Sequence, residues 1–355
     1  MVRQDLRVLL RIIYMWKLEI KMNENAKKKI GITVGVFLFL EVILAFFLLS
    51  PFTSFVSGGA GGNVTVQTFL DVGASYPEIL NITVDDYADE IILTANSTKT
   101  VTCTALMVDY NNDTDMVNLS GVFYDATASD SNPDPTTLDD NNYHYTNSSC
   151  IINYDTGGWG APDDEYNAIG NCTFEVHYYA NPGNWNCSMT VIDNTSLSDT
   201  QEDDILMADL LAVGLPDSIN YGTVNATYVS LEQTTSVSNA GNVELNLSLS
   251  GYAQTEGDGF AMNCSLGREG VIPIEYEKYN LTETTPGEVS LTVFENLYLN
   301  LTSSPFVREF NLNVREDDLI NDAVKDSFWR IYVPKGAAGT CQGNIVFGAT
   351  QSPGS

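Results

Sequence analysis

Four side chains with oxygen donors stand at alternate positions in the stretch VDYNNDTDMVN: Asp109, Asn111, Asp113 and Asp115. This spacing matches the start of a D-x-[DN]-x-[DN]-G calcium loop, because hard oxygen ligands surround Ca²⁺. The sixth position is Thr114 instead of Gly and the twelfth is Ser120 instead of Glu, which excludes the complete motif. Two interpretations stay open: a looser calcium site between two strands, or an acidic turn. Calcium is the one cofactor that the sequence suggests.

Other reactive combinations are missing from the sequence. The chain has two histidines, His144 and His177, and no C-x-x-C pair, so the sequence offers no zinc motif. Acidic residues are numerous, but nothing singles out two of them as a glycosidase pair. No Ser/His/Asp or Cys/His combination stands out either. We therefore predict a protein that is not an enzyme.

Glycosylation acceptor triplets, Asn-x-Ser/Thr, are frequent beyond residue 60. Such triplets mark surface positions in exported chains. Because Asn, Ser and Thr are all abundant, several triplets are expected by chance. Three of them, at Asn171, Asn186 and Asn263, enclose a cysteine, and an Asn buried in a strand cannot carry a bulky sugar. The predicted glycan sites are Asn63, Asn81, Asn96, Asn112, Asn118, Asn147, Asn194, Asn225, Asn246, Asn280 and Asn300.

The charges are distributed very unevenly. Eight of the 16 Lys and Arg residues lie before residue 30, none occurs between Lys99 and Arg268, and the net charge is −30. Such an acidic surface repels phosphate backbones, so we expect no nucleic-acid partner. It is compatible with solubility in a salty medium or with divalent cations.

A continuous apolar run extends from Ile30 to Leu49. About 20 helical residues at about 1.5 Å each cover the roughly 30 Å hydrocarbon core of a bilayer. Because the basic residues precede this run, the positive-inside rule places the N-terminus in the cytoplasm and the bulk of the chain outside the cell. We expect a basic leader over 1–29, a single-pass transmembrane helix over 30–50 and a Gly/Ser linker over 51–62. A signal peptide is the competing interpretation, and Met22 is an alternative start.

Glu41 lies near the middle of this apolar run. A carboxylate at that depth is expected to be protonated or turned toward a partner helix. A glutamate in a hydrophobic helix after a basic leader resembles type IV pilin subunits. The glycine register and Pro51 at the end of the run depart from that pattern.

The remaining chain alternates apolar and polar residues, with Asn, Asp and Gly at the turns, which predicts a mainly β fold of two antiparallel sandwiches. We expect helix only over 163–169 and in part of 202–213. The predicted domains are 63–212 and 213–355. The expected strands are 63–72, 100–109, 117–125, 172–180, 185–193, 243–252, 271–279, 328–334 and 343–349.

Two cysteines, Cys103 and Cys187, lie in the middle of expected strands of the first domain. This pattern resembles immunoglobulin-like sandwiches, in which an inter-sheet disulfide joins strands B and F and an aromatic residue (here Trp185) precedes the second cysteine by two positions. From the residues alone, six cysteines allow fifteen pairings. The resemblance implies Cys103–Cys187, and then Cys150–Cys172 in an insertion and Cys264–Cys341 in the second domain.

The second domain has a weaker resemblance of its own. INYGTVNATYV (219–229) and VSNAGNVELNLSLSGY (237–252) resemble the opening of archaeal surface β-domains, and WRIYVPKGAAGTCQGNIVFGA (329–349) resembles their closing strands. Similar spacing occurs in TasA- and camelysin-like fibre proteins, whose subunits lend strands to one another. The whole chain resembles archaeal membrane-anchored surface glycoproteins.

Two functions follow as hypotheses. The first is adhesion or interaction at the cell surface with a protein or carbohydrate, with the aromatic insertion around Trp159, near Tyr143, Tyr145 and Tyr154, as the contact surface. The second is a self-assembling subunit of a surface layer or filament, which needs exposed strand edges or helix contacts in the membrane.

Overall fold

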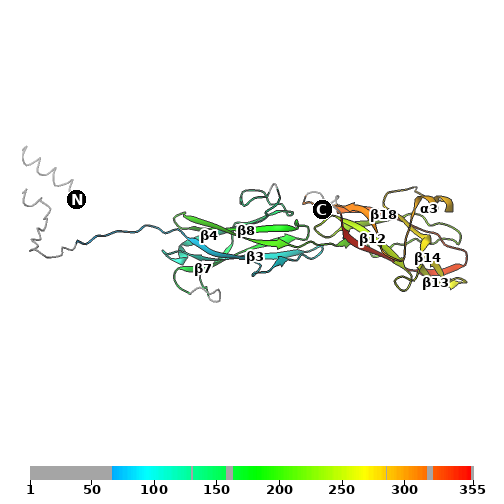
Figure 1. Ribbon diagram of the computed structural model, residues 1–355, viewed down its shortest axis with the longest axis horizontal. Helices are drawn as coiled ribbons and strands as arrows, with labels where there is room; N and C mark the ends of the chain where they lie inside the picture. The colour runs from blue at the N-terminus through cyan, green and yellow to red at the C-terminus, as the bar shows by residue number, and fades with distance from the viewer. Residues whose placement is uncertain (1–65, 129–130, 157–162, 285, 318–322, 353–355) are drawn as a thin grey trace, which may run out of the picture. The chain divides into compact units, whose positions relative to one another are not determined.

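The computed structural model describes residues 66–128, 131–156, 163–284, 286–317 and 323–352. The predicted leader, membrane helix and linker, together with Asn63, lie outside these residues. Within the described ranges, no helix is both long enough and apolar enough to cross a bilayer. The fold is mainly β, and its strands form sandwich-like sheets (Figure 1).

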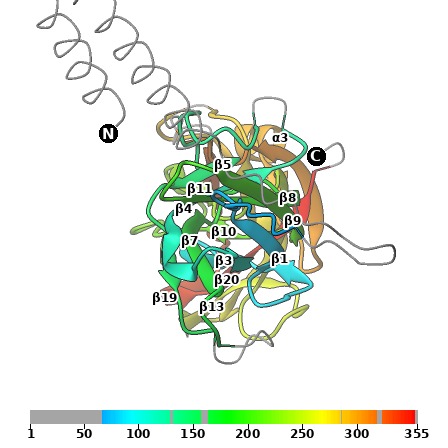
Figure 2. The same cartoon turned by 90° about the vertical axis from the view of Figure 1, so that its left-hand side faces the viewer.

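The strands between residues 78 and 207 form two sheets. The first has the order β1-β3-β7-β6 and the second the order β2-β9-β8-β4-β5. All pairs are antiparallel except β2 and β9. Figure 2 shows β4, β8 and β9 on one side of this group and β1, β3 and β7 on the other. The strands are β1 (Glu78–Val84), β2 (Glu90–Ile91), β3 (Thr98–Val108), β4 (Met116–Asp125), β5 (His144–Asn147), β6 (Ile151–Asn153), β7 (Asn167–His177), β8 (Gly183–Asp193) and β9 (Ser198–Met207).

Buried side chains at alternate positions along the strands form the core of this first group. On β3, every second residue from Val101 to Met107 is fully buried, because successive side chains of a strand point to opposite faces. Trp185 on β8 is fully buried and stacks on Phe123 of β4 at 4.8 Å between ring centroids. Its indole Nε1 donates a hydrogen bond to the Asn181 carbonyl at 2.8 Å, which satisfies the polar end of the ring.

The strands from residue 213 onward form three sheets, with the orders β10-β11-β18-β15-β16, β17-β12-β20 and β14-β13-β19. One short helix, α3 (Leu291–Leu297), begins after Ser290, whose side chain accepts a hydrogen bond from the Val293 amide. The strands are β10 (Val213–Gly214), β11 (Gln233–Asn239), β12 (Leu245–Tyr252), β13 (Phe260–Gly267), β14 (Val271–Pro273), β15 (Glu277–Asn280), β16 (Leu299–Asn300), β17 (Phe306–Leu312), β18 (Val324–Ile331), β19 (Ala337–Gln342) and β20 (Asn344–Gln351).

The core of this second group centres on Trp329 of β18. This side chain is fully buried and packs between Tyr279 of β15 and Phe347 of β20. The leucines of β12 complete the cluster, because their alternate positions face the same interior.

Four of the secondary-structure predictions differ from the structure. Residues 163–169 and 202–213 contain no helix, because β7 begins at Asn167 and β9 continues to Met207 in register with β8. The described part of the expected strand 63–72 is not paired in any sheet. The expected strand 271–279 is divided by the 3-10 turn η2 (Ile274–Tyr276). Gly73–Ser355 forms one compact unit, so the domain boundary near residue 213 stays a prediction.

Candidate functional site

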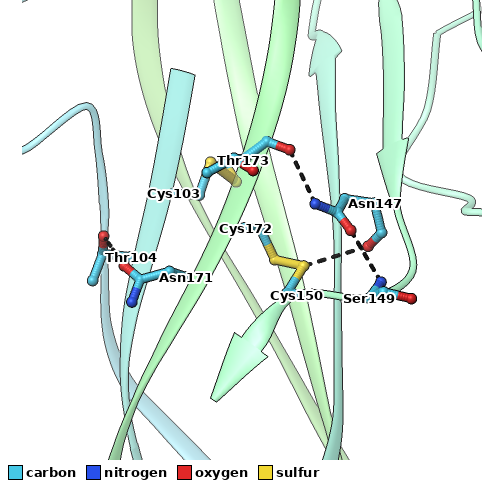
Figure 3. The surroundings of a disulfide bond; sticks show 9 residues. Cys103, Thr104, Asn147, Ser149, Cys150, Asn171, Cys172 and Thr173 are labelled. Atoms are coloured by element: carbon cyan, nitrogen blue, oxygen red, sulfur yellow. Dashed lines mark hydrogen bonds between the residues drawn. A yellow bond between two sulfur atoms is a disulfide. The ribbon is translucent and has the colours of Figure 1, made fainter. Parts of the chain in front are cut away.

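All six cysteines form disulfide bonds. The pairs are Cys103–Cys187, Cys150–Cys172 and Cys264–Cys341, as the immunoglobulin resemblance implies. The first pair joins β3 of one sheet to β8 of the facing sheet. The second lies directly beside it, because Cys103 and Cys172 are opposite each other on the neighbouring strands β3 and β7 (Figure 3). Together the three disulfide bonds cross-link both groups of sheets.

A glycine makes room for this pair of disulfides. Gly121 on β4 faces Cys172, and a Cβ atom added at Gly121 would lie 2.8 Å from the Cys172 sulfur. No larger residue fits there without displacing the cross-link.

The predicted glycan sites differ in exposure. Asn246 is 2% exposed, its Oδ1 accepts the backbone amides of Phe310 and Asn311, and a glycan cannot fit there. The prediction for Asn246 is therefore wrong, because the backbone of the neighbouring strand β17 holds this side chain on the face of β12 opposite its core leucines. Asn112, Asn147 and Asn280 are half-buried. The exposed sites are Asn81, Asn96, Asn118, Asn194, Asn225 and Asn300, where glycosylation stays a prediction.

Asn147 and Asn171 lie on either side of the Cys150–Cys172 disulfide (Figure 3). Asn147 Nδ2 donates to the Thr173 carbonyl at 3.0 Å, and its Oδ1 accepts the Ser149 amide at 3.0 Å. Asn171 Oδ1 accepts the Thr104 hydroxyl at 2.9 Å. Both amides therefore bind neighbouring strands beside the disulfide.

Side-chain oxygens of the predicted calcium loop accept hydrogen bonds from other groups of the protein. Asn112 Oδ1 accepts the Thr114 amide and so caps the 3-10 turn η1 (Asp113–Asp115). Asp113 is buried. Asn111 Oδ1 accepts the Ser75 amide, and Asp115 Oδ1 accepts Asn194 Nδ2.

Asp109 is the exception within this loop. Its side chain is fully buried, Oδ1 accepts the Asn111 amide at 2.9 Å, and Oδ2 has no hydrogen-bond partner. Burial raises the pKa of Asp109, and the negative charges of Asp115 and Asp193 raise it further. In the described ranges, no three Asp, Glu, His or Cys side chains are grouped closely enough to hold a metal ion. Calcium binding at this loop stays a prediction.

Of the aromatic residues expected to form a contact surface, Tyr145 belongs to the core and Tyr154 is 38% exposed. Tyr145 is 6% exposed and packs against Trp185 at 5.9 Å, and its hydroxyl donates to the Asn141 carbonyl. The Tyr154 hydroxyl donates to the Met116 carbonyl at 2.9 Å. Trp159 lies outside the described residues.

A groove of about 1170 Å³ lies in the second group of sheets. It is lined by residues 220–225, 227–231 and 233, and by 288–291, which lie at and before the start of α3. Its side chains are mostly uncharged amides and hydroxyls, among them Asn220, Thr223, Asn225 and Ser290. Tyr228 adds a ring that is 61% exposed. The groove therefore offers hydrogen-bonding groups and an exposed aromatic face. The sequence analysis missed this combination because it comes from two separate stretches of the chain that lie mostly outside regular strands.

A buried basic side chain was also missed. Arg330 on β18 is fully buried, and its guanidinium donates to the Tyr298 hydroxyl and to the Ser230 carbonyl, each at 2.7 Å. Glu232 accepts the Tyr298 hydroxyl and lies 3.8 Å from Arg330 Nε. Burial raises the pKa of Tyr298, and its hydrogen bond to Glu232 acts in the same direction.

A buried carboxylate lies on a neighbouring strand. Glu277 on β15 is 2% exposed and accepts a hydrogen bond from the Tyr221 hydroxyl at 2.8 Å. Burial raises the pKa of Glu277 to about 7, and the Tyr221 hydrogen bond opposes that shift. In sequence, Glu277 looks like any acidic residue of this acidic chain, so no pattern distinguishes it.

The chain matches no protein-family model and no curated protein sequence. Among solved structures it is similar to β-sandwich carbohydrate-binding modules, with 9% identity and a TM-score of 0.23 over 78% of this chain and 97% of that one. It is also similar to a Streptococcus agalactiae BspA C-terminal domain, with 14% identity and a TM-score of 0.19 over 72% of this chain and 94% of that one. A chain of a chaperone–tip adhesin complex of CFA/I fimbriae has 11% identity and a TM-score of 0.26, over 79% of this chain and 92% of that one. Similarities this loose assign no ligand to this chain.

Proposed function

We propose that this chain is a non-enzymatic cell-surface protein of the archaeal glycoprotein type, anchored by the predicted helix over 30–50. It presents disulfide-bonded β-sandwiches for adhesion. The single observation that supports adhesion best is the polar groove beside Tyr228. An open groove with amides, hydroxyls and an exposed ring suits a carbohydrate, whose hydroxyls need hydrogen-bonding partners and whose apolar face stacks on an aromatic ring.

The test is binding of the full chain to an array of oligosaccharides, followed by titration calorimetry with each one retained. Replacing Tyr228 by Ala should weaken binding at least tenfold, because the stacking surface is lost. Tyr110 is 66% exposed and belongs to the first group of sheets, so Tyr110→Ala is the matched control and should change nothing. Equal weakening by both substitutions, or no retained sugar, would contradict the proposal.

Self-assembly is the second candidate, and a different observation favours it. Val66, Phe69, Leu70 and Val72 are 78–89% exposed in a segment that is not paired in any sheet. Four large apolar side chains in an extended segment suit pairing with a strand edge of another copy.

Sedimentation velocity of the full chain in detergent tests this candidate. Concentration-dependent growth that disappears in Phe69→Asp/Leu70→Asp would support self-assembly. The matched control is Leu138→Asp, which also replaces an exposed leucine. A monomer at all concentrations would leave adhesion as the proposed function.

A further inference from the structure

Three polar side chains lie in a row across the sheet β18-β15-β16. Lys278 of β15 is directly opposite Arg330 of β18 on one side and Asn300 of β16 on the other. Residues opposite each other on neighbouring strands project from the same face, so the three side chains lie next to one another. Lys278 is 2% exposed, although lysine is rarely buried to this degree.

The surroundings bring three reactive groups together at Lys278. Its Nζ contacts Asn300 Oδ1, and it lies 2.8 Å from Glu295 Oε2. Glu295 belongs to α3, as does Phe294, a fully buried residue whose ring centroid is 5.3 Å from Nζ. An amine, a carboxamide and a carboxylate therefore meet over an aromatic ring.

We propose that Lys278 and Asn300 become joined by an intramolecular isopeptide bond. Nζ, as the neutral amine, attacks Cγ of Asn300, so that the Nζ–Cγ bond forms and the Cγ–Nδ2 bond breaks. The Glu295 carboxylate accepts a proton from Nζ and delivers it to Nδ2, which leaves as ammonia. Amine and carboxamide thus give a secondary amide and ammonia, with no oxidant, reductant or cofactor.

The fold places the reacting groups of Lys278 and Asn300 in contact before the reaction begins. The strands hold the amine against the amide, which converts a slow bimolecular reaction into an intramolecular one. Glu295 contacts the reacting nitrogen directly, so it can act as the proton carrier without moving. The product would join β15 to β16 covalently, at a sheet edge where β16 has only two residues.

This bond excludes another modification. Asn300 begins the triplet Asn300-Leu301-Thr302 and is a predicted glycan site. An N-glycan and an isopeptide bond both use the Asn300 amide, so a single molecule carries at most one of them.

Tryptic peptide mapping of the full chain, produced in a host without N-glycosylation, gives a direct test. Trypsin cleaves after Arg268, Lys278 and Arg308 in a chain without the bond, which yields 269–278 and 279–308 as separate peptides. An acylated Lys278 is not cleaved, so the proposal requires one peptide covering 269–308 that is lighter by one ammonia. Two separate peptides with the full mass would overturn it.

Variants test the role of Glu295. Glu295→Gln should restore cleavage after Lys278 and the full peptide mass, because the proton carrier is lost. Glu288→Gln, which changes an exposed acid shortly before α3, is the matched control and should leave the linked peptide intact. Linked peptide in Glu295→Gln would overturn the role assigned to Glu295. In a glycosylating host, a sugar on Asn300 in most molecules would overturn the proposal itself.

Discussion

The two groups of sheets stabilise their interiors in different ways. The first, between residues 78 and 207, contains two neighbouring disulfides and a core of stacked aromatic rings around Trp185. The second, from residue 213 onward, contains one disulfide and buries Arg330, Lys278 and Glu277 beside its aromatic core. Buried charges are costly unless they are paired, and Arg330 and Lys278 each lie within 4 Å of a glutamate. In the isopeptide proposal, the buried Lys278 is the reacting amine.

Removing the disulfides gives the largest expected effect. The Cys103–Cys187 and Cys264–Cys341 pairs span 84 and 77 residues, so replacing either pair by Ala should lower the free energy of unfolding by about 4.5 kcal/mol in the chain-entropy model. Cys150–Cys172 spans 22 residues, and its loss should cost about 3.4 kcal/mol. Urea denaturation measures all three. A much smaller loss for Cys264–Cys341 would show that the second group depends less on cross-linking.

Removing a buried charge of the second group gives the next largest expected effect on stability. Arg330→Met should lower the free energy of unfolding by about 4 kcal/mol, because the Ser230 carbonyl and the Tyr298 hydroxyl each lose a donor and Glu232 loses the nearby positive charge. Lys335→Met changes an exposed cation and should alter stability by less than about 0.5 kcal/mol. If both variants unfold at the same urea concentration, the guanidinium is not a structural part of this group.

Glu277 should make the second group sensitive to pH. Its pKa is about 7 in the folded chain, above the ordinary value of 4.5, so the folded state binds the proton more tightly than the unfolded state. This contribution is fully present below the unfolded value and is lost as the pH rises through about 7, which amounts to about 3 kcal/mol. In Glu277→Gln the difference in unfolding free energy between pH 5 and pH 8 should shrink by about 2.5 kcal/mol, because pH 5 already lies above the unfolded pKa. The same change in the exposed Glu275→Gln would contradict the assignment to Glu277.

Calcium gives the smallest expected effect and concerns the first group. If the Asp109 loop binds Ca²⁺, a concentration ten times the Kd should stabilise the folded chain by about 1.4 kcal/mol. Asp109→Asn should abolish that response in thermal denaturation, whereas Asp134→Asn, in an exposed loop, should keep it. Equal responses of both variants would indicate a general salt effect.

The sequence predicts the strands well where alternation is strict, as on β3 and β8, because the period of two is a direct consequence of strand geometry. It failed on residues 202–213, whose acidic run hides the alternation, although residues 202–207 pair with β8. The short helix α3 was missed because its seven residues include one buried side chain, Phe294, which is too few for a period to show.

The functional candidates were harder to predict than the fold. Lys278, Asn300 and Glu295 meet because three elements bring them together, and no local pattern links them. Asn300 was noticed only as a glycan site. Asp109 was found from its spacing, but its unpartnered oxygen is a property of the folded interior.

The Cys264–Cys341 disulfide also affects how the chain responds to proteases. Arg268 is exposed between β13 and β14, in a region where few basic residues are accessible to trypsin-like enzymes. A cut after Arg268 separates Cys264 from Cys341 along the chain, yet the bond between them keeps the two pieces joined. The three-stranded sheet β14-β13-β19 also holds their ends in register. A nicked molecule would therefore persist as one particle and come apart only after both reduction and unfolding.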